Sequence, residues 1–207
     1  MPIATGMPVY PGDPEVELRP ALTVPEDGCN VLGLRLGSHT GTHVDAPRHV
    51  DDRLSTLDEL PLDHFVGPAV VVDARGRPPR TPLGPDLFAD VAHLGMIVLV
   101  ATGWSARWGA EDYHAHPYLS PEAARLLAGA GVPTVGIDAL SVDATPAEEL
   151  PAHHALCGAG VVIAENLANL DALVEAQSAG VPIEVSLLPL RLFGADGSPV
   201  RAVARLG

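Results

Sequence analysis

The order of apolar runs along the chain predicts alternating strands and helices. Short aliphatic runs bounded by glycine, proline or polar residues favour buried strands, and they lie at 68–73, 96–102, 132–138, 161–164 and 181–186. Helices are predicted between them, at 85–93, 120–129 and 169–178. Such alternation is typical of an α/β chain whose sheet is covered by helices.

The N-terminal third of the chain follows a different pattern. Residues 1–25 are rich in proline and glycine, which favours short strands and turns. The segment 30–38 partly alternates apolar and polar residues, so we expect a strand that leads directly into a histidine-rich stretch. Residues 51–65 predict a turn and a short helix. No linker or internal repeat divides the sequence, so we expect a single domain over residues 1–207.

The composition indicates a folded, acidic protein. Hydrophobic residues make up 47% of the chain, charged residues 18%, and the net charge is −14. All 12 basic residues are arginine, which excludes Schiff-base lysine chemistry and phosphate loops of the Gly-Lys-Ser/Thr kind. Because the arginines are scattered, we expect no binding to nucleic acid or to an anionic membrane surface.

The cysteines and the apolar runs indicate the cellular compartment of the protein. Cys29 and Cys157 are the only cysteines, too few for a disulfide framework, so a reducing cytoplasm is expected. The first residues lack the basic region and apolar core of a signal peptide. The longest apolar run, at 94–101, is far shorter than a membrane span.

The most informative stretch is residues 38–49, which read Ser-His-Thr-Gly-Thr-His-Val-Asp-Ala-Pro-Arg-His. It holds His39, His43, Asp45 and His49, all at odd-numbered positions. Side chains alternate between the two faces of an extended strand, so an extended segment would put all four on one side. Glycine, proline and β-branched residues disfavour a helix here, unlike the helical motif of zinc proteases.

An ideal strand would hold His39 and His43 too far apart to share a metal ion. Four residues at about 3.3 Å each span roughly 13 Å, whereas each ligand atom must lie about 2 Å from the ion. Gly41 lies midway and can adopt dihedrals that other residues avoid. We therefore predict a bend at Gly41 that brings the two histidines together, with Asp45 as the third ligand. His49 lies further along, where a general acid/base is needed. The alternatives are a solvated histidine-rich strand and histidines buried in the core.

A second pair of candidate ligands occurs near the C-terminal end of the chain. His153 and Glu165 are separated by twelve positions, and Glu165 ends the predicted strand at 161–164. The carboxyl ends of strands are where α/β sheets bind ligands. From spacing alone two alternatives remain open, since His153 could be a surface residue and Glu165 could cap the following helix.

Other polar and aromatic residues are weaker candidates. The loop at 103–119 contains Trp104, Trp108, His114 and His116. Its tryptophans could line a pocket or cover the core, and its histidines could be exposed. Ser141 and Asp143 could orient metal ligands or belong to ordinary turns.

Several segments together resemble the metal-dependent cyclase family, which contains the bacterial kynurenine formamidases and isatin hydrolase. The segments lie at 8–13, 39–49, 102–104, 136–143 and 165–167, in the family's order and over almost the whole chain. The histidine stretch is the most specific of them. The resemblance implies an α/β fold with a swivelling β/β/α arrangement and a mixed sheet. It also implies assembly as a homodimer or homotetramer.

The resemblance further implies a divalent-metal centre with two ions per subunit. The ligands it implies are His39, His43 and Asp45 for the first ion, and Asp45 as a bridge to a second ion completed by His153 and Glu165. Mixed imidazole and carboxylate ligands suit zinc, manganese or iron and disfavour calcium, and of these we expect zinc or manganese.

The residues expected at the substrate are Tyr10 and Trp104. The formamidase branch carries tryptophan at the position of Tyr10, where the side chain packs on the substrate's aromatic ring. A tyrosine can also stack on a ring. The difference nevertheless disfavours an assignment restricted to N-formylkynurenine.

Together these features predict hydrolysis of an amide-type C–N bond, linear or cyclic, in a small molecule. Metal ions would lower the pKa of bound water towards about 7 and polarise the carbonyl. His49 would then pass a proton to the leaving nitrogen. Alternatives on the same site are a lactone hydrolase and a biosynthetic cyclase or dehydratase. The alternative from another class is a metal-binding protein without catalysis, which would not need His49.

Overall fold

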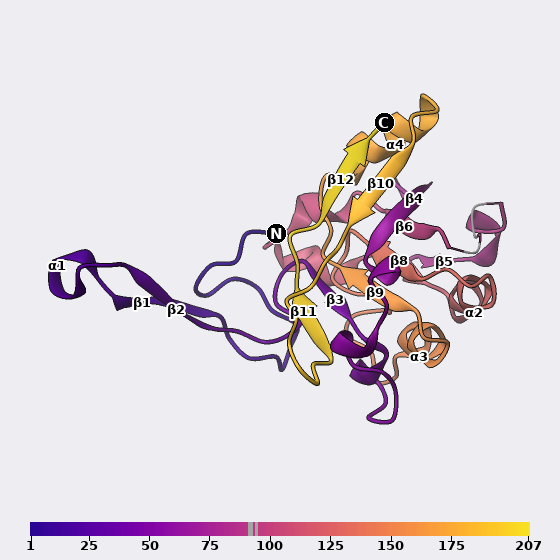
Figure 1. The fold of residues 1–207 in the computed structure, drawn as a ribbon. Helices are drawn as coiled ribbons and strands as arrows, with labels where there is room; N and C mark the ends of the chain where they lie inside the picture. The colour runs from indigo at the N-terminus through magenta and orange to yellow at the C-terminus, as the bar shows by residue number, and fades with distance from the viewer. Residues whose placement is uncertain (91–92, 94) are drawn as a thin grey trace.

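The computed structural model describes residues 1–90, 93 and 95–207, and its centre is an eight-stranded mixed sheet (Figure 1). The four middle strands run parallel to one another: β4 (Val66–Asp73), β6 (Ile97–Ala101), β8 (Thr134–Ile137) and β9 (Val162–Glu165). Antiparallel strands extend the sheet beyond β9 with β3 (His43–Asp45) and β11 (Gly197–Pro199), and beyond β4 with β10 (Ile183–Ser186) and β12 (Val203–Leu206). The predicted α/β fold with a mixed sheet is confirmed.

Helices cover both faces of the sheet. Helices α2 (Pro121–Gly129) and α3 (Pro151–Gly158) pack on one face, and α4 (Leu170–Ser178) packs on the other. Strand β6 illustrates this coverage of both faces, since its residues belong alternately to the hydrophobic clusters on the two sides of the sheet. All five of its residues are buried, as expected for a strand of a sheet covered on both faces.

Shorter elements connect these layers. Two-residue strands β5 (Pro82–Leu83) and β7 (Tyr118–Leu119) pair in parallel as a small separate sheet. Six 3-10 helices lie in the connections among the described residues, at Pro47–His49 (η1), Leu57–Glu59 (η2), Leu62–His64 (η3), Pro85–Leu87 (η4), Trp104–Arg107 (η5) and Glu111–Ala115 (η6).

The structure corrects several predicted elements. The helix expected over 85–93 is only the 3-10 turn η4, and residues 91 and 92 of that prediction lie outside the described residues. The short helix expected in 51–65 is a pair of 3-10 turns, η2 and η3. Helix α3 and strands β11 and β12 were not predicted, because each is short and lacks a marked hydrophobic period.

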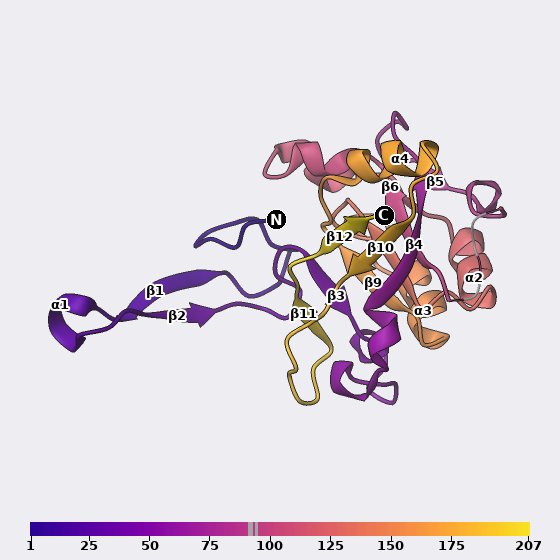
Figure 2. The ribbon, with the colours of Figure 1, turned by 45° about the horizontal axis from the view of Figure 1, so that its top comes forward.

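The strand expected over 30–38 forms, but outside the central sheet. Strand β2 (Val31–Arg35) pairs with β1 (Glu17–Leu22), and the short helix α1 (Val24–Asp27) joins them at the tip. This hairpin, here called the arm, projects far from the body of the molecule in both views (Figures 1 and 2). Partial alternation predicts a strand, but it does not indicate which sheet the strand joins.

None of the helices in the described residues is long and apolar enough to cross a membrane.

Candidate metal centre

The bend predicted at Gly41 is confirmed. Gly41 has a φ of +65°, in the left-handed region that glycine adopts without strain. Strand β3 begins only at His43, after the bend. The rings of His39 and His43 consequently lie with their centroids 5.2 Å apart, far closer than an ideal strand allows.

Asp45 lies between these histidines and a second pair of side chains. Its Oδ1 is 2.7 Å from His39 Nδ1 and 3.2 Å from His43 Nε2. Its Oδ2 is 3.7 Å from His153 Nε2, and His153 Nε2 is 3.4 Å from Glu165 Oε1. The structure therefore brings all five predicted ligands together in two groups that share Asp45, namely His39, His43 and Asp45, and Asp45, His153 and Glu165.

The sheet register sets this arrangement. Strand β3 runs antiparallel to β9 and places His43 directly opposite Glu165, the last residue of β9. Glu165 is therefore a strand residue, and its Oε1 accepts a hydrogen bond from the Val142 amide at 2.8 Å. His153 arrives from α3 and is buried, so the surface alternative for His153 is wrong.

Outer partners hold the rings of two of the histidines. His43 Nδ1 donates to the Gly41 carbonyl at 2.8 Å. His153 Nδ1 lies 2.7 Å from Asp143 Oδ2, and Asp143 is itself held by the backbone amides of Ala152 and His153. In each ring the nitrogen Nε2 is left facing the shared carboxylates, the arrangement usual for metal-ligating histidines. The orienting role considered for Asp143 fits this geometry.

The charges of the site are unusual for a protein interior. Burial opposes protonation of His39 and His153, yet Asp45 and Asp196 raise the pKa of His39 to about 10, and the Asp143 hydrogen bond helps to raise that of His153 to about 10. Burial, followed by the charge of Asp45, raises the pKa of Glu165. Buried carboxylates that repel one another in this way are stabilised by a cation between them.

One atom provides a direct test of whether a metal ion fits. Asp45 Oδ2 is buried and has no hydrogen-bond partner within the part of the chain that the structure describes. A buried carboxylate oxygen without a partner is costly. It faces His153 and belongs to a set of imidazole and carboxylate donors suited to a divalent transition metal. The residues therefore fit a divalent ion at this position.

His49 lies beside the ligand groups on the 3-10 helix η1 and not on strand β3. Its ring centroid is 4.1 Å from that of His39 and 5.6 Å from that of His153. Burial lowers the pKa of His49, which favours the neutral imidazole needed to accept a proton. The predicted proximity of His49 to the ligands is confirmed.

A cavity of about 310 Å³ lies against the site and is lined by its four histidines and Glu165. Its size suits a small molecule. Tyr10 lines the cavity as expected, but the tryptophan on its wall is Trp108. Trp104 packs in the hydrophobic core at 4% exposure, and its indole donates to the Tyr113 carbonyl. The expectation that Trp104 contacts substrate is therefore not supported by its position. The exposed position considered for the loop histidines does not hold for His116, which is buried.

Asp196 is a member of this cluster that the sequence analysis missed. It precedes β11, and its Oδ2 lies 3.0 Å from His39 Nε2 and 3.7 Å from His49 Nδ1. Asp196 is 157 positions from His39 in sequence, and it lies outside the histidine stretch at 38–49. The antiparallel pairing of β11 with β3 and the hydrogen bond from the Ala46 amide to the Asp196 carbonyl bring the two together.

Comparisons with known proteins show which sequences and folds this chain is similar to. A family model described as "Putative cyclase" matches residues 1–144. A kynurenine formamidase of Salinibacter ruber is 40% identical over 206 residues, covering 95% of this chain and 91% of the relative. A kynurenine formamidase of Paracidovorax citrulli is 37% identical over 211 residues, covering 99% and 93%. The solved structure of isatin hydrolase A from Labrenzia aggregata bound to benzyl benzoate superposes with a TM-score of 0.84 at 27% identity, covering 99% of this chain and 90% of that one.

Replacing His153 should reduce metal binding more than replacing its neighbour. His153→Ala removes a ligand from the group with Asp45 and Glu165, so we expect zinc affinity to fall by more than about 100-fold, since loss of an outer partner alone costs about 10–100-fold. His154→Ala, on the exposed side of the same helix, is the matched control and should bind like the parent. Titration against a chelating dye measures both. Equal affinities in the two variants would contradict this assignment.

Proposed function

Because the chain belongs to the cyclase family, we propose that it hydrolyses a small aromatic amide, either an N-formyl arylamine or a cyclic amide fused to an aromatic ring. The relatives identify the chain as a metal-dependent amide hydrolase. The observation that carries the proposal is at Asp45, which belongs to both ligand groups and whose Oδ2 has no hydrogen-bond partner among the residues that the structure describes. His49 lies beside these groups on the wall of the cavity.

The ligand groups would hold one or two divalent ions, with zinc or manganese favoured by the donor set. His39, His43 and Asp45 would form one position, and Asp45, His153 and Glu165 the other. A divalent ion in such a site acts as a Lewis acid that acidifies water and polarises a carbonyl. Two ions per subunit remain our proposal, supported by the two groups that share Asp45.

His49 would move the proton that the reaction requires. Hydrolysis joins the oxygen of water to the carbonyl carbon, breaks the C–N bond and transfers one proton to the departing nitrogen. Because His49 Nδ1 faces Asp196 at 3.7 Å, we assign this proton transfer to Nε2. The lowered pKa of His49 keeps the ring neutral at the start, so that it can accept a proton from water and return it to the amine.

Two aromatic side chains on the cavity wall support an aromatic substrate. Tyr10 and Trp108 line the cavity together with apolar residues such as Leu140 and Leu150. Rings of this kind stack on or pack edgewise against a substrate ring. One tyrosine and one tryptophan can accommodate more than one ring system, so the class named here is wider than N-formylkynurenine.

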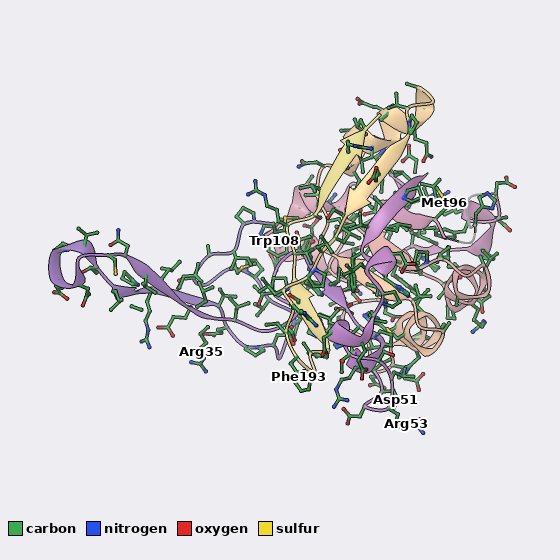
Figure 3. The ribbon with its side chains drawn as sticks, in the orientation of Figure 1. Arg35, Asp51, Arg53, Met96, Trp108 and Phe193 are labelled. Carbon is green, nitrogen blue, oxygen red and sulfur yellow. The ribbon has the colours of Figure 1, made fainter. Side chains whose placement is uncertain are left out.

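We propose further that the chain forms a homo-oligomer, a homodimer or homotetramer, through the arm. Five large apolar side chains of the arm are between 38% and 64% exposed, namely Leu22, Val24, Val31, Leu32 and Leu34. A two-stranded hairpin alone is marginally stable, and its apolar surface favours burial against a partner. A second copy of the chain offers apolar surface at 188–193, where Phe193 is 97% exposed (Figure 3).

We also propose that the protein works in a reducing cytoplasm. This proposal is supported by Cys29 and Cys157, which are both free thiols among the described residues, one exposed and one buried. Exposed free thiols are typical of proteins from reducing compartments.

Replacing His49 tests catalysis separately from metal binding. His49→Ala should retain its metal and lower kcat on formanilide by about 10²–10⁴-fold, the usual contribution of a general acid/base. His64→Ala, on η3 outside the cavity, should retain both. Elemental analysis and steady-state kinetics on amide, cyclic imide and lactone substrates give the readouts. A parent protein that binds metal but turns over none of them would favour the non-catalytic alternative, and turnover of lactones alone would favour a lactone hydrolase.

Replacing apolar residues of the arm tests the oligomer. The double variant Leu32→Ser/Leu34→Ser removes two exposed leucines, so we expect it to elute as a monomer while the parent elutes at twice or four times that mass. Leu62→Ser, at a leucine that is 70% exposed on η3, is the control and should not change the mass. Light scattering coupled to gel filtration measures it. A monomeric parent would contradict this proposal without affecting the metal centre.

A further inference from the structure

Both ring nitrogens of His39 are engaged. Nδ1 lies 2.7 Å from Asp45 Oδ1, and Nε2 lies 3.0 Å from Asp196 Oδ2. A histidine can ligate a metal ion through one nitrogen only if that nitrogen carries no proton. The partner of the other nitrogen therefore decides which of the two is available.

The other two histidines of the centre show the same division. His43 and His153 each direct Nε2 towards the shared carboxylates and bond through Nδ1 to an outer acceptor. In His39 the roles of the nitrogens are reversed, because Nδ1 faces Asp45 and Nε2 faces outwards. Its outer acceptor is Asp196.

The chain positions Asp196 through its backbone. The Ala46 amide donates to the Asp196 carbonyl at 2.8 Å, and the next residue, Gly197, pairs with Asp45 across β11 and β3. A Cβ at Gly197 would come within 2.7 Å of His39 Cε1 and 3.0 Å of the Val44 carbonyl oxygen. Glycine is thus required for the His39 ring to lie this close to β11 while Asp196 reaches its outer nitrogen.

From this geometry we infer that Asp196 is a positioning residue of the metal centre. Its carboxylate accepts the Nε2–H of His39, which fixes the tautomer and directs the unprotonated Nδ1 towards Asp45 and the ion. A carboxylate that orients a ligating histidine also increases the basicity of the ligand. The inference rests on the proposed metal centre and adds a contribution of the C-terminal segment to that centre.

The test compares Asp196→Asn with His39→Ala, Gly197→Ala and the exposed control Asp63→Asn. We expect Asp196→Asn to lower Zn²⁺ affinity by about 10–100-fold, less than His39→Ala does, and to change the visible spectrum of the Co²⁺-substituted protein. Asp196→Glu should restore part of the affinity. Gly197→Ala should also shift the Co²⁺ spectrum, but differently from Asp196→Asn, because the added methyl group displaces the His39 ring away from β11. Asp63→Asn, whose side chain is 83% exposed, should match the parent.

The results that would contradict the inference can be told apart from those that would contradict the proposed metal centre. If Asp196→Asn leaves Zn²⁺ affinity and the Co²⁺ spectrum unchanged, the inference is wrong. It is also wrong if affinity is kept while kcat falls and the pH profile moves, because Asp196 would then act on His49. A loss as large as that of His39→Ala would make Asp196 a ligand in its own right. If the parent binds neither Zn²⁺ nor Co²⁺, it is the proposed metal centre that fails.

Discussion

The arrangement of this site depends on the carboxylate of Asp45, which is buried between two groups of ligand atoms. Its Oδ1 faces His39 and His43, and its Oδ2 faces His153 without a hydrogen-bond partner among the described residues. An ionised carboxylate in the interior requires compensating charge. Burial opposes ionisation of Asp45, but His43 and His39 hold its pKa well below the usual range. A divalent cation would satisfy the same demand and release those histidines to act as neutral ligands.

The sheet is built so that this carboxylate can be buried. The parallel strands at its centre bring their carboxyl ends to one edge, and β9 places Glu165 there. The antiparallel strand β3 then sets His43 opposite Glu165, with Asp45 two residues further along the same face. Strand β11 pairs with the other side of β3, and Asp196 is the residue just before it. The centre therefore combines three neighbouring strands with one helix. The group of His39, His43 and Asp45 comes from one short stretch of sequence, whereas the group of Asp45, His153 and Glu165 needs two strands and the helix.

How much of this site could be predicted depended on how local each contact is. The group of His39, His43 and Asp45 could be predicted because the residues are close in sequence and Gly41 offers an obvious place to bend. Spacing alone left His153 and Glu165 undecided, since strand pairing and an unpredicted helix bring them in, and the family resemblance supplied them. Asp196 could not be found because its contact joins segments 157 positions apart. Trp104 and Trp108 could not be told apart, because the fold around the 3-10 helix η5 decides which indole is buried in the core and which lines the cavity.

The most direct test of the central claim is X-ray diffraction from crystals of the purified protein, with anomalous data collected at the zinc and manganese absorption edges. The account predicts an anomalous peak within about 2.0–2.2 Å of Asp45 Oδ2, in contact with His153 and Glu165. It predicts a second peak on the Oδ1 side when both positions are filled. Crystals soaked in either metal that show no peak at Asp45, with Oδ2 bonded to water or to a side chain, would contradict it.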